Sequence, residues 1–307
     1  MIQNKILEEP KFREHKLQTN GLVLKLKDNG FDKECSLVKS CGGYLLFSRD
    51  EHQVSKEQRR KLKEANFCRF RFCSMCNWRR VRKVGVQMIE ALEEIEKKKE
   101  VSYLSLTLTI NNPKVDDLKD AVKEMNESFK RMSKLKIYKN AIIGHFKALE
   151  LLGDNTKDEE IHPHFHILLV VSKGYFKSKN YISQAKWAEM WGKSLRVDYT
   201  PIVHIRRIKP NVRRRMNALN SAVLEVAKYA VKHTELENRT DDDFGKIIIK
   251  TKGMRFFATG GELKKSINLL KLDEDLIGLK EKTEAEWVQI EEELYRWIDG
   301  DYRLSVK

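Results

Sequence analysis

The sequence predicts an α+β protein whose central part is an antiparallel sheet with flanking helices. Residues 103–110 alternate between apolar and hydroxyl side chains, which is typical of a half-buried strand. Two further strands, expected over 141–152 and 161–170, are separated by a short acidic turn, so we expect them to be antiparallel neighbours. Apolar residues recur at helical spacing over 84–95 and 118–135, which predicts helices beside these strands.

The composition favours a polyanionic partner. The chain has 307 residues, a formal net charge of +15 and a sequence pI near 9.4, which is typical of proteins that bind nucleic acid. No apolar run approaches the ~18 residues that a membrane helix needs. Residues 1–16 mix charged and apolar side chains and lack the apolar core of a signal peptide. We therefore expect a cytoplasmic protein with no membrane partner.

The cysteines predict a structural zinc site. All five lie in the first quarter of the chain, and disulfides are rare in the cytosol. The spacing Cys68-x4-Cys73-x2-Cys76 forms a tight knuckle, and Cys41, just before two glycines, supplies a fourth thiolate. Cys35 could take the place of Cys41, and buried free thiols are the alternative to zinc. The knuckle has a basic collar that we expect to contact DNA phosphates, and its members include Arg69, Arg71, Arg79 and Arg80.

Three histidines predict a second metal site. His162, His164 and His166 alternate along the third strand, so they share one face and can converge two at a time on one ion. The alternative is that they are core histidines, but three of the chain's eight histidines on one strand face favour a metal. Glu150 ends the preceding strand and could complete the site with His164 and His166. Alternatively, Glu150 is only the last residue before a polar loop.

A basic strand and a helix follow. The strand over 202–208 leads into a run of positive charges that predicts a phosphate track, with Arg206, Arg207, Arg213 and Arg214 among its members. In the helix expected over 217–236, Glu225 and Tyr229 are four residues apart and share a face, with Lys232 alongside. Nearby lysines favour the deprotonated phenol that a nucleophile requires, although most helical tyrosines only pack.

These motifs together carry a resemblance. In chain order they are Cys68-Arg69-Phe70-Arg71-Phe72-Cys73-Ser74-Met75-Cys76-Asn77-Trp78-Arg79-Arg80, Leu104-Ser105-Leu106-Thr107-Leu108-Thr109, His162-Pro163-His164-Phe165-His166-Ile167-Leu168 and Glu225-Val226-Ala227-Lys228-Tyr229. The combination resembles the rolling-circle plasmid replication initiators, in the single-tyrosine branch of the HUH endonuclease superfamily. The likeness covers about residues 41–261 and implies the HUH endonuclease palm as the fold.

The resemblance implies a DNA-nicking mechanism. His164 and His166 would hold Mg²⁺ or Mn²⁺, with Glu150 as third ligand and His162 as the alternative. Because magnesium prefers oxygen ligands, the imidazoles favour manganese at least as strongly. Tyr229 would attack the scissile phosphate, leaving a 5′-phosphotyrosine and a free 3′-hydroxyl that primes a polymerase. Glu225 would activate water for the terminating cleavage. DNA contacts would extend to Lys228 and Lys232.

Two alternatives remain open. A conjugative relaxase or an HUH transposase would share the ion site and the tyrosine, whereas a non-catalytic zinc-dependent DNA-binding regulator would use only the charge and the cysteines. The expected partner is plasmid origin DNA, single-stranded or in a hairpin at the nick site. The sequence has no Gly-x-x-x-x-Gly-Lys-Ser/Thr loop, so ATP binding is not expected and a host helicase is implied.

Three regions are predicted: 1–83 as an N-terminal zinc-binding and DNA-binding module, 84–262 as the HUH endonuclease catalytic domain, and 263–307 as a C-terminal helical region. Within the second region, 247–257 is expected to be a strand pair with a turn at Gly253. The acidic C-terminal region would fold back on the basic body or mediate a homodimer, and the sequence leaves both open.

Overall fold

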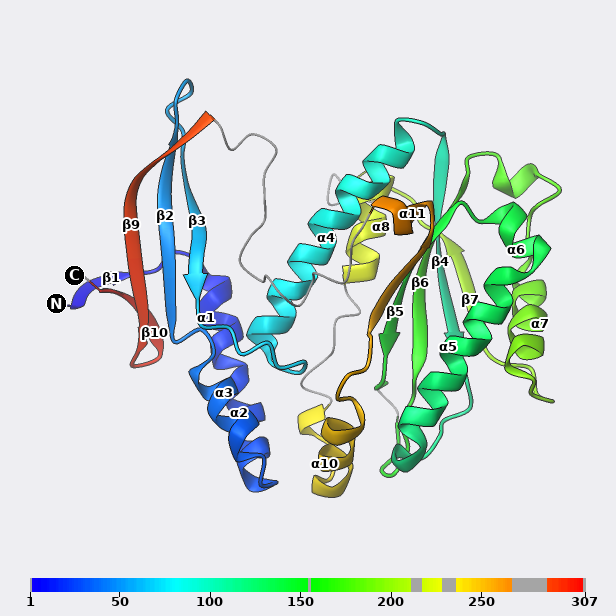
Figure 1. Cartoon of the computed structure of the whole chain (residues 1–307), viewed down its shortest axis with the longest axis horizontal. Coiled ribbons are helices and arrows are strands. Elements are labelled where there is room, and N and C mark those ends of the chain that lie inside the picture. The colour runs from blue at the N-terminus through cyan, green and yellow to red at the C-terminus, as the bar shows by residue number, and fades with distance from the viewer. Residues whose placement is uncertain (1, 154–155, 211–216, 228–235, 267–285, 306–307) are drawn as a thin grey trace. The chain divides into compact units, whose positions relative to one another are not determined.

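The computed structural model describes residues 2–153, 156–210, 217–227, 236–266 and 286–305. These residues form two five-stranded antiparallel sheets with helices beside them (Figure 1). The chain divides into two compact units, Met1–Lys83 with Lys271–Lys307 and Val84–Leu270. The predicted α+β class, with antiparallel sheets and flanking helices, is confirmed. None of the helices within the described ranges is both long and apolar enough to cross a membrane.

The first unit contains the sheet with strand order β1-β10-β9-β2-β3. Its elements are β1 (Ile2–Ile6), α1 (Pro10–Leu17), α2 (Thr19–Asp28), α3 (Asp32–Ser40), β2 (Tyr44–His52), β3 (Gln58–Ala65), the first part of α4 (Ser74–Glu96), β9 (Trp287–Ile298) and β10 (Asp301–Ser305). Phe12 of α1 packs edge-on against Phe47 of β2 and Tyr302 of β10, with ring centroids 5.6 and 6.5 Å apart. The two ends of the chain therefore share one hydrophobic core.

The prediction that 263–307 is a helical region is wrong over its last part, because Trp287–Ile298 is strand β9, paired with β2 and β10. The β9–β10 hairpin turns at Asp299 and Gly300, which both have positive φ, and this dipeptide favours two-residue hairpin turns. The sheet accommodates the acidic residues of β9. Glu293 is only 1% exposed and accepts a hydrogen bond from Arg60 Nε at 2.8 Å.

The second unit contains the sheet with strand order β7-β4-β6-β5-β8. Its elements are the rest of α4, β4 (Val101–Thr109), η1 (Val115–Asp117), α5 (Leu118–Lys134), α6 (Lys136–Ala141), β5 (Gly144–Glu150), β6 (His164–Ser172), η2 (Tyr175–Lys177), α7 (Gln184–Leu195), β7 (Val203–Arg207), α8 (Ala218–Ala227), α10 (Asp241–Lys250), β8 (Phe257–Gly261) and α11 (Glu262–Ser266). The predicted helices over 84–95 and 118–135, and the predicted antiparallel pairing of β5 with β6, are confirmed.

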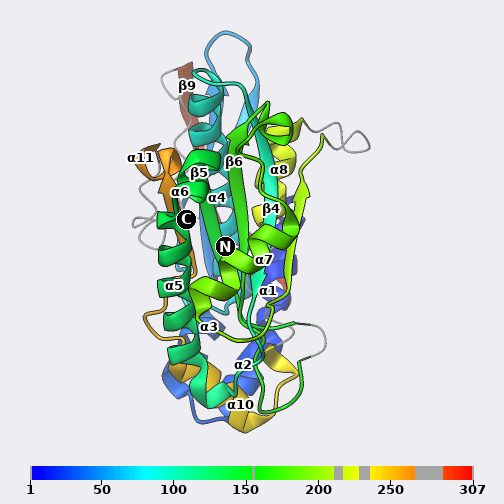
Figure 2. The same ribbon diagram turned by 90° about the vertical axis from the view of Figure 1, so that its right-hand side faces the viewer.

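Helices cover the two faces of this sheet differently. Phe165 of β6 contacts Phe129 of α5 and Trp191 of α7, with ring centroids 6.1 and 6.4 Å apart. Helices α5 and α7 therefore lie on one face, in front of the sheet in Figure 2. Because side chains alternate along a strand, His164 and His166 point to the other face, where α8 packs against β4 and β6. We call this the histidine face.

The strand pair predicted over 247–257 is also wrong, because residues up to Lys250 form helix α10 and only β8 follows. The run of isoleucines suggested a strand, but the preceding residues favour a helix. Thr240 caps the helix by accepting a hydrogen bond from the Asp243 backbone N–H, and three aspartates lie in the first turn, where they interact favourably with the helix dipole.

Candidate functional site

Strands β5 and β6 bring a carboxylate and two imidazoles together. In their register Glu150 pairs with His164, and Ala148 pairs with His166. Glu150 Oε2 lies 3.3 Å from His164 Nε2 and 2.9 Å from His166 Nε2. Adjacent ligands of an octahedral ion bound at ~2.1 Å lie ~3 Å apart. The two distances from the carboxylate are close to this spacing, and all three ligand atoms lie within 4.8 Å of one another, as the ligands of one ion require.

The surroundings of these side chains favour metal binding. His164 Nδ1 donates to the carbonyl oxygen of His162 at 2.8 Å, which leaves Nε2 as the ring nitrogen that faces Glu150. His166 Nδ1 lies 3.3 Å from the Thr107 hydroxyl. Burial alone would raise the pKa of Glu150, but hydrogen bonds from the two histidines lower it to about 2. The cluster therefore keeps a buried carboxylate ionised.

His162, the alternative ligand in the sequence prediction, lies beside this cluster. It precedes β6, and its Nδ1 is 2.7 Å from Asn112 Oδ1. Its ring centroid is 4.8 Å from that of His164. Burial and the neighbouring histidines lower the pKa of His162, so it is neutral near pH 7. The structure thus brings together Glu150, His164 and His166, and places His162 at their margin.

An arginine–aspartate clamp, which the sequence prediction missed, holds the loop between β5 and β6. Arg239 and Asp243 are both buried and form an ion pair of 2.8 Å. Arg239 Nη1 donates to the carbonyl oxygens of Thr156 and Lys157, and Asp243 accepts from the backbone N–H of Glu159. Arg239 lies just before Thr240, the N-cap of α10, and Asp243 is in the first turn of that helix, so no helical pattern in the sequence marked the pair. The clamp fixes the loop that joins Glu150 to the histidines.

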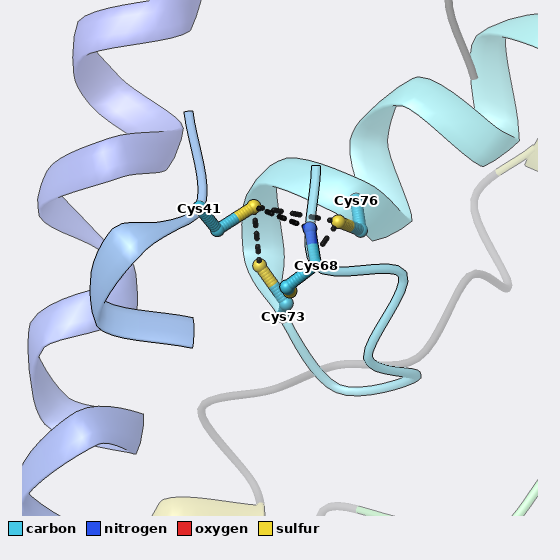
Figure 3. A group of neighbouring side chains, drawn as sticks. All are labelled: Cys41, Cys68, Cys73 and Cys76. Atoms are coloured by element: carbon cyan, nitrogen blue, oxygen red, sulfur yellow. Dashed lines mark hydrogen bonds between the residues drawn. The ribbon is translucent and has the colours of Figure 1, made fainter. Parts of the chain in front are cut away.

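Four cysteines of the first unit form a compact cluster (Figure 3). Cys41, at the end of α3, lies 3.5 Å from Cys76 and 3.7 Å from Cys73, and Cys68 lies 3.6 Å from Cys76, measured between sulfur atoms. Four sulfurs bound at ~2.3 Å around tetrahedral zinc lie ~3.8 Å apart. Cys35 is outside this cluster, because its thiol points to the carbonyl oxygen of Val23. Of the two candidates, the structure brings Cys41 to the knuckle.

The knuckle is built to support negative sulfur atoms. The backbone N–H groups of Cys68, Arg69 and Phe70 donate to cluster sulfurs at 3.2–3.4 Å. Hydrogen bonds among the four thiols hold the pKa of Cys73 well below its ordinary value and raise the pKa of Cys68 and of Cys76, so the negative charge of the cluster is centred on Cys73. The buried ammonium of Lys16 donates to the carbonyl oxygen of Cys41 at 2.7 Å, which brings a positive charge close to the cluster. These groups suit the donor set of a structural zinc ion.

Part of the predicted basic collar is buried rather than displayed. Arg79 and Arg80 are 6% and 1% exposed, so little of either side chain is available to phosphates, and their contact with DNA stays a prediction. Arg79 lies over the Trp78 ring at 5.7 Å, and Arg80 donates to the carbonyl oxygen of Arg69. An arginine can bury its guanidinium when carbonyl and aromatic partners surround it. Arg69 is exposed and Arg71 is partly exposed.

Exposed arginines also occur on β7, where Arg206 and Arg207 end the strand. Five of the predicted site residues lie outside the described residues, namely Arg213, Arg214, Lys228, Tyr229 and Lys232. Glu225 belongs to α8, but its side chain is not among those described. The predicted nucleophile and its neighbouring base therefore stay predictions.

Comparison with known sequences identifies the family. A profile of the family described as Replication protein matches residues 59–303. The chain belongs to this replication-protein family. "Protein rep" of Bacillus amyloliquefaciens is 35% identical over 272 residues, which cover 82% of this chain and 78% of that protein. "Protein rep" of Lactiplantibacillus plantarum is 32% identical over 274 residues, covering 85% and 84%. No solved structure matches the chain.

The resemblance to plasmid replication initiators is therefore confirmed. In this replication protein the histidine cluster and three of the four clustered cysteines fall inside the matched residues, and Cys41 precedes them. Strands β9 and β10 also lie almost wholly within the match, which ends at Arg303. Both clusters and the C-terminal hairpin therefore lie in or next to the part of the chain that the family shares.

Proposed function

We propose that this replication protein is a rolling-circle initiator of the HUH type, which nicks one strand of plasmid origin DNA. The observation that carries the proposal is the cluster of Glu150, His164 and His166, whose ligand atoms lie within 4.8 Å of one another on adjacent strands. Family membership supplies the replication context. The formal net charge of +15 supports a nucleic-acid substrate.

The two clusters suit different ions. Two imidazoles and a carboxylate would hold Mn²⁺ or Mg²⁺, and the imidazoles favour manganese. Bound there, the ion would polarise the scissile phosphate and offset the negative charge that develops on it. The four cysteines would hold a structural Zn²⁺, which links the end of α3 to the start of α4 and leaves no open position for chemistry.

The proposed nucleophile is Tyr229. Its phenolic oxygen attacks the scissile phosphorus, the bond from phosphorus to the 3′-oxygen breaks, and the 3′-oxygen takes a proton. This leaves a 5′-phosphotyrosine and a free 3′-hydroxyl, which a host polymerase extends behind a host helicase. Support comes from α8, which packs on the histidine face and whose last residue, Ala227, is two positions before Tyr229.

Glu225 is the proposed base for termination. It would take a proton from water, so that water replaces a second tyrosine in the last cleavage. Glu225→Ala should then nick at a near-normal initial rate but give replication products longer than one plasmid unit. If this variant instead gives products of one plasmid length, termination does not need Glu225 and another residue is the base. A homodimer at the origin would bring two such sites together and belongs to the same proposal.

A nicking assay tests the proposed function. The full chain is incubated with a labelled single strand that contains the plasmid origin, first with EDTA and then with excess Mn²⁺. We expect no cleavage in EDTA and full recovery when manganese is added. Cleavage that continues in EDTA, or no cleavage of any origin strand with manganese, would overturn the proposal.

A further inference from the structure

The edge strand β7 links the histidine face to the opposite face of the sheet. In the register of β4, Thr107 pairs with His166 on one side and with His204 of β7 on the other. His204 therefore lies in the same row as a cluster histidine, and it is exposed. Because side chains alternate, Arg206 points to the histidine face and Arg207 points to the other. Both arginines are exposed, so positive charge continues around the edge of the sheet.

A rigid loop after β6 presents aromatic rings beside this edge. The phenol of buried Tyr175 donates to the carbonyl oxygen of Ile182 and accepts from the Ile182 backbone N–H, at 3.3 and 3.0 Å. The Ser178 hydroxyl donates to the carbonyl oxygen of Tyr175 at 2.9 Å. Held in this way, the loop leaves Phe176 39% exposed and Tyr181 49% exposed, with ring centroids 6.2 Å apart. We call these two residues the aromatic platform.

The platform is surrounded by positive charge. The guanidinium carbon of Arg207 lies 5.1 Å from the centre of the Phe176 ring. Lys177 and Lys179 of the loop are exposed, and residues 173–182 contain no carboxylate side chain. Exposed aromatic rings among cations suit an unpaired base with its phosphates, because every base has a stacking face and every linkage carries a negative charge. An apolar protein partner would not need the cations.

We propose that the aromatic platform and Arg207 bind single-stranded DNA on one flank of the scissile phosphate. The inference rests on the proposed function for the location of that phosphate. Arg207 pairs with Leu104 of β4, which is three residues from Thr107 and therefore ~10 Å away along the strand. Strand β7 is two strands away from β6, which adds ~10 Å across the sheet. A strand that leaves the histidine cluster across His204 reaches the platform after a few nucleotides. The platform thus selects unpaired DNA next to the nick site.

A binding experiment in EDTA tests this inference separately from nicking. The full chain is titrated into a fluorescent single strand of the origin, and binding is followed by anisotropy. Replacing both Phe176 and Tyr181 by alanine should weaken binding at least about fivefold for each lost stack. Tyr181→Phe keeps the ring and should bind as the wild type does. Leu135→Ala removes another exposed apolar side chain of the same unit, which is 40% exposed and flanked by lysines, and should have no effect.

Two further measurements distinguish base stacking on the platform from electrostatic attraction between the basic protein and DNA phosphates. In separate oligonucleotides, one base is removed at each position along both flanks of the nick site. Loss of the base at one of these positions should weaken binding by the wild type but not by the double alanine variant. Arg207→Gln should lower the slope of log binding constant against log salt concentration by about one, which corresponds to the loss of one phosphate contact. Equal binding by the wild type and the double variant would overturn the inference, as would an equal loss for duplex DNA of the same sequence. Absence of nicking with Mn²⁺ would overturn the proposed function but not this binding result.

Discussion

Glu150 lies directly opposite His164 across the antiparallel pair β5–β6, and its Oε2 is 3.3 Å from His164 Nε2. The same oxygen lies 2.9 Å from Nε2 of His166, two residues further along β6. Because strand pairing alone aligns these three side chains, the ligand atoms are fixed by backbone hydrogen bonds rather than by a mobile loop. The clamp formed by Arg239 and Asp243 holds the connecting loop.

Removing the carboxylate charge should remove the ion. Glu150→Gln preserves the shape of the side chain but weakens one ligand, so Mn²⁺ affinity measured by calorimetry should fall at least ~100-fold. Nicking should fall with it, because the ion supplies several kcal/mol of transition-state stabilisation. Glu127→Gln, on the exposed surface of α5, is the control and should leave both unchanged. Unaltered manganese binding by Glu150→Gln would show that the ion is held elsewhere.

Breaking the clamp should destabilise the second unit. Arg239→Met leaves Asp243 buried without its ion partner, which costs about 3–5 kcal/mol of unfolding free energy. Urea unfolding followed by circular dichroism measures this loss. Lys246→Met, on helix α10 with Asp243, removes exposed ion pairs to Asp116 and Asp242 and should cost less than ~1 kcal/mol. Similar losses for both variants would contradict a special role for the clamp.

The cysteine cluster should contain one zinc ion that depends on Cys41 and not on Cys35. Metal analysis of the purified chain should find about one equivalent of zinc. Cys41→Ser should lose it and unfold the first unit, because zinc binding contributes ~10–16 kcal/mol in small structural sites. Cys35→Ser should keep both the zinc and the fold, because its thiol is outside the cluster. Wild-type protein without zinc would refute the assignment.

The buried amine of Lys147 should make stability depend on pH. Burial lowers the pKa of Lys147 to about 7 from its ordinary value of 10.5. Between these two pH values the unfolded chain binds more protons than the folded chain, so stability rises with pH. Relative to Lys147→Met, which has no such group, the wild type should gain about 2–3 kcal/mol between pH 7 and pH 9.5. Parallel pH profiles of unfolding free energy would show that the amine keeps its ordinary pKa when folded.

The parts of the site that could be predicted from the sequence are those that depend on local pattern. The alternation of His164 and His166, and the short connection back to Glu150, were sufficient to predict their meeting across β5 and β6. The choice between Cys41 and Cys35 was not predictable from spacing. It depends on α3 ending at Cys41, so that this sulfur reaches the knuckle whereas that of Cys35 turns to Val23.

Long-range pairing explains the main error in the fold. Strand β9 pairs with β2, from which it is separated by more than half of the chain, and no local pattern in the sequence indicates such a partner. Glutamate is common in helices and depleted in strands, and only the Asp299–Gly300 dipeptide marked a hairpin. Similarly, Arg79 and Arg80 have the charge of a phosphate-binding surface, but burial is set by the packing of the whole fold.

The most direct test of the account is the identity of the residue that becomes linked to DNA. The chain is incubated with an origin strand and Mn²⁺, the product is digested with protease and nuclease, and the nucleotide-bearing peptide is identified by mass spectrometry. We predict a 5′-phosphate on Tyr229 that is absent in EDTA, in Glu150→Gln and in Tyr229→Phe. A metal-dependent adduct on another residue, such as Tyr199, or efficient cleavage without any adduct, would contradict the account.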